Sequence, residues 1–183
     1  ARLAEAGWKG GPFAAVHLAS FAHAAKRWDL ARFAEVFDHL AARRGLPVVL
    51  LGSSGETNVN VQAAALATKA RTFDLAGKTS LPEALGVLTE ARVFVGNDSG
   101  LAHLASAAGT PAVVVFGPTD PDATRPWDGP RPDGKPVRLA LVRRRPLCAP
   151  CPFDVCPIDH ACMEGVTPAD VLAAADKVLG DER

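Results

Sequence analysis

Residues 91–117 read ARVFVGNDSGLAHLASAAGTPAVVVFG, in which two short apolar runs flank a polar turn and a helix-like stretch. The runs 93–95 and 112–116 are rich in β-branched residues and predict two strands. Between them, residues 96–100 predict a tight loop and residues 101–108 a helix. A strand, a helix and a second strand over so short a stretch are typical of the βαβ unit of a parallel sheet.

The same alternation continues on both sides of this unit. Residues 13–18 predict a strand, and residues 30–44 predict a helix because their apolar positions recur every three or four residues. Residues 47–51 are apolar throughout, which is typical of a strand covered on both faces. The other expected elements are a helix at 57–70, a strand at 72–75, a helix at 81–91, a further strand at 139–142 and a closing helix at 168–179. The pattern predicts an α/β fold, a doubly wound, mostly parallel Rossmann-like sheet.

Length and composition predict one globular domain over residues 1–183, with 48% hydrophobic and 22% charged residues. Residues 118–165 are expected to form an irregular, Pro- and Cys-rich excursion within it. Twenty basic residues balance twenty acidic ones, which argues against a general nucleic-acid partner. The sequence contains no apolar run near the roughly 20 residues that span a bilayer and no signal-peptide core, so a cytoplasmic protein is expected.

Ligands of an open α/β sheet bind beyond the carboxyl ends of its strands. After the strand at 93–95, the helix start at Ser99 and Gly100 would present free N–H groups, which attract anions such as phosphate. His103 follows one helical turn later and could face the same ligand. The alternative is that Asp98 and Ser99 only cap the helix.

Two further loops carry candidate ligand contacts. Lys26 and Arg27 precede a helix N-terminus, where cations oppose the helix dipole, so a bound phosphate would explain Lys26. The alternative is a solvated pair beside a core Trp28. Glu56 follows a glycine-containing turn and could bond ribose hydroxyls, or simply occupy the first turn of a helix. Neither a G-x-G-x-x-G fingerprint nor a P-loop is present, which counts against a dinucleotide enzyme or an NTPase.

All four cysteines, Cys148, Cys151, Cys156 and Cys162, fall within fifteen residues. Clustered cysteines in a cytosolic protein favour a metal site over disulfides, but this spacing matches no common zinc or iron–sulfur pattern. Free thiols, or a disulfide formed during handling, remain the alternatives. The three arginines at 143–145 are either a solvated basic edge or a contact for phosphate groups at a membrane surface.

Four segments in this order resemble one known family: residues 25–28 (AKRW), 74–81 (DLAGKTSL), 96–103 (GNDSGLAH) and 116–121 (FGPTDP). They are similar to the family 9 glycosyltransferases, the ADP-heptose:lipopolysaccharide heptosyltransferases. The tail at 148–163 also resembles the subset close to heptosyltransferase II. The likeness covers about residues 12–180 and implies the C-terminal, donor-binding domain of a GT-B enzyme, with the N-terminal acceptor domain absent.

The resemblance implies a donor site for ADP-heptose. Its implied contacts are Lys26 and Ser20 at the diphosphate, Glu56 at the ribose, the backbone near Lys78 and Thr79 at the adenine, and Asp98, Ser99, Gly100 and His103 at the diphosphate and sugar. No catalytic residue is assigned, because the family's general base belongs to the absent domain. A metal is not assigned, and no cofactor is expected.

The implied function is inverting transfer of heptose from ADP-heptose to the lipopolysaccharide inner core. The lipid A–Kdo acceptor would bind the absent domain, so this chain alone is expected to be inactive. Cytoplasmic location with peripheral contact at the inner membrane is expected. Two alternatives stay open: a stand-alone nucleotide- or sugar-binding module without transferase activity, and a GT-B enzyme that uses another nucleotide-sugar donor.

Overall fold

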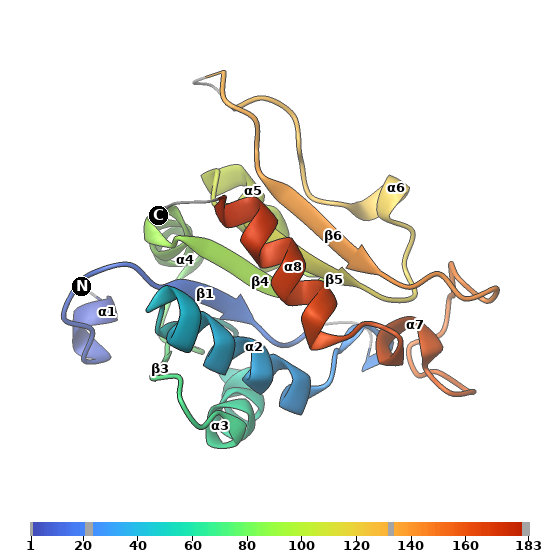
Figure 1. Ribbon diagram of the computed structural model, residues 1–183, viewed down its shortest axis with the longest axis horizontal. Coiled ribbons are helices and arrows are strands. Elements are labelled where there is room, and N and C mark those ends of the chain that lie inside the picture. The colour runs from blue at the N-terminus through green and yellow to red at the C-terminus, as the bar shows by residue number, and fades with distance from the viewer. Residues whose placement is uncertain (1, 21–23, 132–133, 181–183) are drawn as a thin grey trace.

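The computed structural model contains one sheet of six parallel strands in the order β3-β2-β1-β4-β5-β6 (Figure 1). It describes residues 2–20, 24–131 and 134–180. The strands are β1 (Ala14–His17), β2 (Val48–Leu50), β3 (Thr72–Asp74), β4 (Val93–Asn97), β5 (Ala112–Phe116) and β6 (Leu139–Arg143). The α-helices are α1 (Arg2–Glu5), α2 (Leu30–Arg44), α3 (Thr57–Leu66), α4 (Leu81–Glu90), α5 (Gly100–Ala108), α6 (Pro121–Thr124), α7 (Ala161–Glu164) and α8 (Pro168–Leu179), with 3-10 turns η1 (Ala24–Lys26) and η2 (Ser54–Glu56). The expected doubly wound α/β fold is confirmed.

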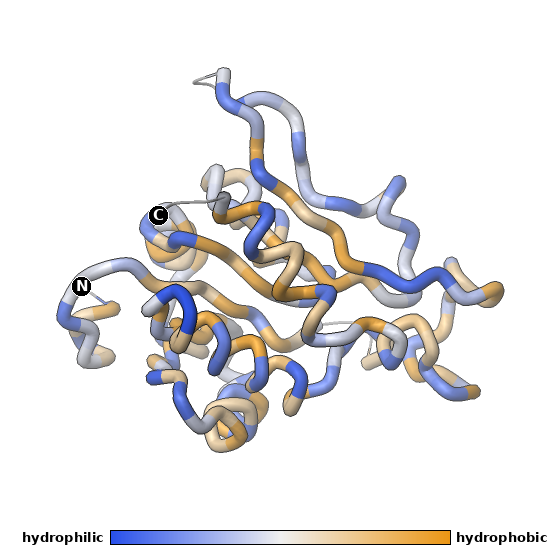
Figure 2. Tube along the Cα trace, viewed as in Figure 1, coloured by the Kyte–Doolittle hydropathy of each residue, from blue (hydrophilic) through white to orange (hydrophobic). Residues whose placement is uncertain are grey.

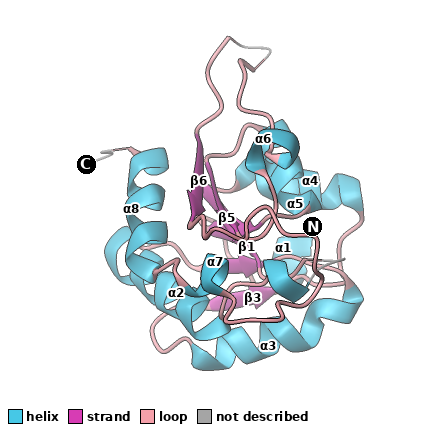
Figure 3. Cartoon of the chain, turned by 90° about the vertical axis from the view of Figure 1, so that its right-hand side faces the viewer, coloured by secondary structure: helices cyan, strands magenta, loops and turns pink. Residues whose placement is uncertain are grey.

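Helices cover both faces of the sheet, which Figure 3 shows nearly end-on between α2 and α8 on one side and α4 and α5 on the other. Successive residues of a strand point to opposite faces. Val93 and Val95 of β4 therefore join the core under α2, α3 and α8, and Phe94 joins the core under α4 and α5. Because both faces are buried, the central strands are apolar except at the carboxyl ends of β1 and β4 (Figure 2).

The two longest helices have the bounds that the sequence predicts. Asp29 caps α2 by accepting from the Arg32 N–H, and Gly45 ends it in the left-handed conformation at φ 64°. Thr167 and Asp170 form a capping box at the start of α8, with Pro168 in its first turn. Local sequence signals therefore set the limits of α2 and α8.

The expected helix at 57–70 ends earlier than predicted, at Leu66. The Asp38 carboxylate of α2 accepts the N–H groups of Thr68, Lys69 and Ala70 at 2.7–3.0 Å, and also the Thr68 hydroxyl at 2.7 Å. These donors would otherwise belong to the last helical turn. A side chain thirty residues away therefore ends α3.

Outside residues 132–133, the stretch 118–165 contains three regular elements, α6, β6 and α7. Strand β6 pairs along its length with β5 and forms one edge of the sheet. Between α6 and β6 the chain runs out as a projection (Figure 1), and an isolated antiparallel bridge joins Pro130 to Pro136 within it. The segment after β6 extends beyond the carboxyl ends of the strands and returns through α7 to α8.

The strand order reverses between β1 and β4. Residues 14–74 build the sheet outward in one direction, and residues 93–143 build it in the other. Loops at such a reversal diverge to opposite faces and leave a crevice at the carboxyl ends of the two central strands. This crevice is where the fold favours a ligand.

Candidate functional site

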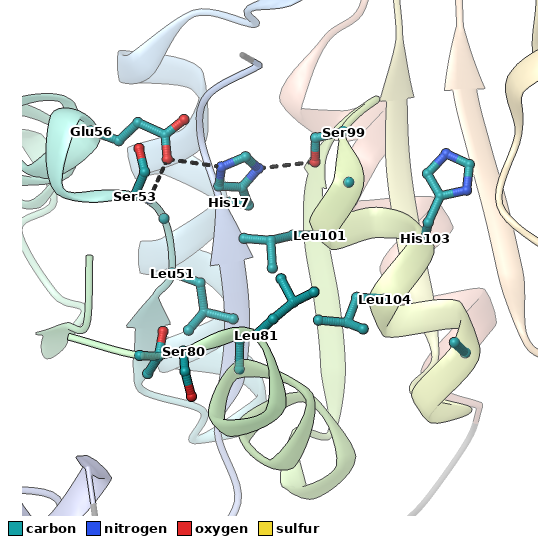
Figure 4. A pocket seen from close by; sticks show the side chains of 15 residues that line it. His17, Leu51, Ser53, Glu56, Ser80, Leu81, Ser99, Leu101, His103 and Leu104 are labelled. Carbon is teal, nitrogen blue, oxygen red and sulfur yellow. Dashed lines mark hydrogen bonds and ion pairs between the residues drawn. The ribbon is translucent and has the colours of Figure 1, made fainter. Parts of the chain in front are cut away.

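A pocket of about 630 Å³ lies at the carboxyl ends of β1 and β2, beside the start of α5 (Figure 4). It occupies the point where the strand order reverses. Its lining residues are His17, Leu51, Gly52, Ser53, Glu56, Thr79, Ser80, Leu81, Ala84, Ser99, Gly100, Leu101, His103, Leu104 and Ala107. Five of the nine predicted site residues, Glu56, Thr79, Ser99, Gly100 and His103, are among them.

The pocket has an apolar part and a polar part. Leu51 after β2, Leu81 of α4, and Leu101 and Leu104 of α5 gather on one side in Figure 4, and Leu81 is 71% exposed. The opposite side carries Glu56, His17 and Ser99. An apolar wall with a few convergent polar groups is the usual composition of a small-molecule site, and it fits a flat ring joined to a hydroxylated, charged group.

His17, the last residue of β1, connects Glu56 and Ser99 on the polar side of the pocket. Its Nδ1 lies 2.9 Å from Ser99 Oγ, and its Nε2 lies 3.4 Å from Glu56 Oε2. Because an ionised carboxylate only accepts hydrogen bonds, Nε2 carries the hydrogen that Glu56 receives. The ring is 6% exposed, so both contacts are formed away from bulk water.

Glu56 is held as an ionised carboxylate. The hydrogen bond from His17 lowers the pKa of Glu56 to about 2, against an opposing effect of burial and together with the Ser53 N–H, which donates at 2.6 Å. The side chain is 17% exposed and borders the pocket. A fixed, ionised carboxylate at a pocket wall is a suitable acceptor for sugar hydroxyls.

The start of α5 presents unused donors to the pocket. Among the described residues, no hydrogen bond uses the backbone N–H of Ser99, Gly100 or Leu101, and Ser99 forms no side-chain cap. Ser99 is the N-cap residue of α5 by backbone position, but neither side chain caps the helix, since the Ser99 hydroxyl meets His17 and the Asp98 carboxylate meets Lys26. Three free N–H groups at a helix start favour an anion.

Asp98, Lys26 and Ser20 lie together behind this helix start. Lys26 Nζ is 2.8 Å from Asp98 Oδ2, the Thr119 hydroxyl donates to the same oxygen at 2.8 Å, and Ser20 Oγ donates to the Asp98 carbonyl at 3.3 Å. Asp98 and Ser20 are each 4% exposed. Lys26 is therefore paired with Asp98 rather than solvated, so a bound phosphate is not needed to explain it. Arg27 is exposed, as the alternative of a solvated pair predicts for it, and Trp28 lies in the core, 2% exposed.

Lys78, Thr79 and His103 lie at the edges of the site. Thr79 lines the main pocket, whereas the Lys78 ammonium donates to the Asp74 carbonyl at 2.8 Å and lines a neighbouring pocket beside α1. In Figure 4 the His103 ring points away from the leucine side chains. Of this loop, Thr79 and not Lys78 therefore borders the main pocket.

The four cysteines are free thiols. Burial raises the pKa of the Cys162 thiol, to which Cys156 and Cys148 add. Within the described parts of the chain, no three His, Cys, Asp or Glu side chains are grouped as a metal site would require. Over the same residues, no helix is long and apolar enough to cross a membrane.

The sequence and fold both match one family. The family model described as glycosyltransferase family 9 (heptosyltransferase) matches residues 3–131. Lipopolysaccharide heptosyltransferase 3 of Escherichia coli is 41% identical over 105 residues, which are 56% of this chain and 30% of that protein. The chain therefore belongs to glycosyltransferase family 9.

Solved structures agree with this family. E. coli ADP-heptose lps heptosyltransferase II superposes with a TM-score of 0.76 and 27% identity over 92% of this chain and 46% of that one. The E. coli heptosyltransferase WaaC with ADP, at 22% identity and a TM-score of 0.66 over 92% and 44% of the two chains, shares the fold. The chain thus spans about 30–46% of the length of these relatives.

Residues that sequence reasoning missed complete the site. His17 ends a strand that is otherwise apolar, and this polar residue at the carboxyl end of β1 is a signal that could have indicated it. Thr119 follows β5, where the same rule applies. The leucines of the pocket wall carry no such signal, because apolar residues on a helix or at a strand end are read as core.

Proposed function

We propose that the pocket binds the ADP part of ADP-heptose, and that this chain is the donor-binding part of an enzyme that transfers heptose to the lipopolysaccharide inner core. The observation that carries the proposal is the arrangement of three features around the start of α5. Free N–H groups at the helix start lie beside an apolar wall on one side and an ionised carboxylate on the other. These three features match a phosphate, a base and a ribose.

The contacts follow from the chemistry of the pocket. The adenine lies against Leu81 and Leu104, bordered by the backbone at Thr79, and the ribose hydroxyls donate to Glu56. The diphosphate takes the N–H groups of Ser99, Gly100 and Leu101. His103, one turn further along α5, meets the sugar end of the donor. Family membership and the relative named for ADP-heptose support this placement.

Lys26 and Asp98 act as a pair next to the diphosphate. The Asp98 carboxylate holds the Lys26 ammonium near the phosphates. A small movement of Nζ therefore replaces the Asp98 oxygen with a phosphate oxygen as its partner. Because Asp98 is an anion, it contacts a sugar hydroxyl rather than a phosphate. Ser20 and Thr119 hold the Asp98 backbone and side chain in this position.

Catalysis by these residues is electrostatic. As the bond between heptose and ADP breaks, negative charge grows on the diphosphate, and the α5 helix start and Lys26 stabilise it. We assign no catalytic base to this chain. Consequently, the 183-residue chain alone binds ADP but transfers no heptose, and turnover by the purified chain would contradict this assignment.

Calorimetric titration of the chain with ADP, UDP and GDP tests the donor class. We expect ADP to bind most tightly, because the leucine wall and the backbone at Thr79 suit adenine. Tighter binding of UDP or GDP would favour a GT-B enzyme with another donor. A second experiment uses a longer protein that carries this chain. If that protein transfers heptose, and a variant that no longer binds ADP does not, the chain is not a binding module without activity.

The segment after β6 fits contact with the membrane that carries a lipid A–Kdo acceptor. Arg143, which ends β6, and Arg145 after it are exposed. Four apolar side chains of the following segment, Leu147, Phe153, Val155 and Ile158, are 54–108% exposed. Arginines beside exposed apolar side chains suit an anionic lipid surface. We expect the chain to sediment with phosphatidylglycerol vesicles and not with phosphatidylcholine vesicles, and equal recovery with both would contradict this contact.

A further inference from the structure

The cysteine-containing segment between β6 and α8 packs against the turn that carries Lys26. We propose that this segment, through His160, is a clamp that positions Lys26 for the diphosphate. The inference rests on the proposed role of Lys26, and it assigns a role to a part of the chain that the donor pocket does not use.

The clamp is formed on one buried residue, Ala25, which is 4% exposed. Its N–H donates to the Asp154 carbonyl at 2.8 Å, and its carbonyl accepts from His160 Nε2 at 2.6 Å. Because a carbonyl oxygen only accepts, Nε2 is the protonated nitrogen of this ring. Both polar groups of the peptide units at Ala25 are thus satisfied by the segment at 154–160.

His160 is held in an unusual backbone conformation for this purpose. It has φ 56° and ψ 30°, the left-handed region, and its N–H donates to Cys156 Sγ at 3.3 Å. Its carbonyl accepts from Met163 and Glu164 and so starts α7, where Met163 is 2% exposed. A second attachment joins the Cys151 N–H to the Pro118 carbonyl at 2.8 Å. The segment is therefore fixed to the strand ends before it reaches Ala25.

Lys26 is the residue directly after this clamped peptide. The turn η1 has only three residues, so it has little regular structure of its own to fix the Lys26 backbone. On the other side, the Trp28 N–H donates to the Asn97 side chain at 3.2 Å. Lys26 therefore lies between two fixed points, and its ammonium reaches Asp98 from that position. Loss of the His160 contact releases one of the two.

Two substitutions separate the hydrogen bond from the backbone conformation. Asn tolerates the left-handed region but is too short to reach Ala25, whereas Gln places an amide donor close to the position of Nε2. We therefore compare His160→Asn with His160→Gln. Cys148→Ser is the matched control, because this thiol is free and exposed on the same segment.

The readout is binding of ADP and of adenosine to the 183-residue chain. We expect His160→Asn to weaken ADP about five-fold, the effect of one lost hydrogen bond, while adenosine affinity changes less than about two-fold. His160→Gln and Cys148→Ser should resemble the parent chain. In a Lys26→Met background, His160→Asn should cause no further loss of ADP affinity, because both changes act on one group. Equal weakening of ADP and adenosine would contradict the clamp and indicate a general structural role.

Hydrogen exchange tests the clamp without any ligand. The Ala25 amide should exchange faster in His160→Asn than in His160→Gln, and equal rates would overturn the inference. If Lys26→Met weakens ADP but His160→Asn does not, the clamp is wrong and the donor site stands. If Lys26→Met leaves ADP affinity unchanged, Lys26 does not bind the diphosphate. The proposed role of His160 in positioning Lys26 for the diphosphate is then also wrong.

Discussion

His17 Nδ1 lies 2.9 Å from Ser99 Oγ, so a side chain at the end of β1 fixes the residue that opens α5. The same ring meets the Glu56 carboxylate through Nε2. The proposed ribose contact and the proposed diphosphate contact are therefore joined by one buried imidazole. Changes to this ring should alter the two contacts separately.

Replacing His17 by Asn should remove its contact with Glu56, and replacing it by Gln should remove its contact with Ser99. An Asn amide occupies roughly the place of Nδ1 and keeps the Ser99 contact, whereas a Gln amide approaches Nε2 and keeps the Glu56 contact. We expect His17→Asn to reduce the preference for ADP over 2′-deoxy-ADP, because Glu56 loses its donor. His17→Gln should keep that preference and weaken ADP about five-fold, from one lost hydrogen bond. Titration with both nucleotides measures this, and identical behaviour of the two variants would contradict it.

Lys26→Met should weaken ADP about ten-fold, the scale of a hydrogen bond to a charged group. It should also lower the free energy of unfolding by about 1–3 kcal/mol, because Asp98 is left buried without its cation. The double variant Lys26→Met, Asp98→Asn should recover stability but not ADP affinity. Urea unfolding and calorimetry on the same samples distinguish the two effects. Recovery of ADP binding in the double variant would show that Lys26 matters only for folding.

Gly100→Val should block the helix start without disturbing the fold. A Cβ at Gly100 meets no atom within 4 Å, and the same holds for Gly86 in α4, which makes Gly86→Val a matched control. From helix propensity, each change should alter stability by less than about 0.5 kcal/mol. Only Gly100→Val should weaken ADP, because its side chain stands beside the free N–H groups. Unchanged affinity in Gly100→Val would place the diphosphate elsewhere.

Asp38→Asn should destabilise the chain by about 1–2 kcal/mol at pH 7, through weaker acceptance of the N–H groups after α3. Burial acts to raise the pKa of Asp38, but the hydrogen bonds from Thr68, Lys69 and Ala70 outweigh it and lower the pKa from 3.8 to about 2. The stability that the charge contributes is therefore present above pH 3.8 and is lost as the pH falls toward 2.

The difference between the parent chain and Asp38→Asn should accordingly shrink between pH 4 and pH 2. Urea unfolding at pH 7 and at pH 3 measures it. Asp176→Asn is the control, since Asp176 forms an exposed ion pair with Arg44 and should cost less than about 0.5 kcal/mol. A difference that stays constant with pH would show that ionisation of Asp38 has no part in stopping α3.

Local patterns were sufficient to predict most of the sheet and, within one residue at each end, the four helices α2, α4, α5 and α8. Apolar β-branched runs gave β1, β2, β4 and β5 within two residues at each end, because each strand is buried on both faces. The limits of α2 and α8 follow from residues inside or next to the helix. The end of α3 could not be predicted this way, since Asp38 acts on it from α2.

The candidate site was predictable in part for a similar reason. Glu56, Ser99 and Gly100 follow strands, and the rule that ligands bind at carboxyl ends selects such positions. The partner of Lys26 was not predictable, because Asp98 lies 72 residues away and its orientation depends on Thr119. The roles of His17 and Ser99 depend in the same way on contacts between strands that only the folded sheet brings together.

The reversal of strand order between β1 and β4 divides the pocket as well as the sheet. Residues before Arg92 supply Glu56, His17 and the loop at Thr79, and residues after it supply the helix start at Ser99. The proposed ribose contact is thus encoded before Arg92 and the proposed backbone donors to the phosphates after it, while Lys26 and Leu104 cross this division. A chimaera joined at the α4–β4 turn that retains Lys26 would keep the N–H groups of Ser99, Gly100 and Leu101 and take a new base contact from its first half, so on this proposal donor preference can change by recombination.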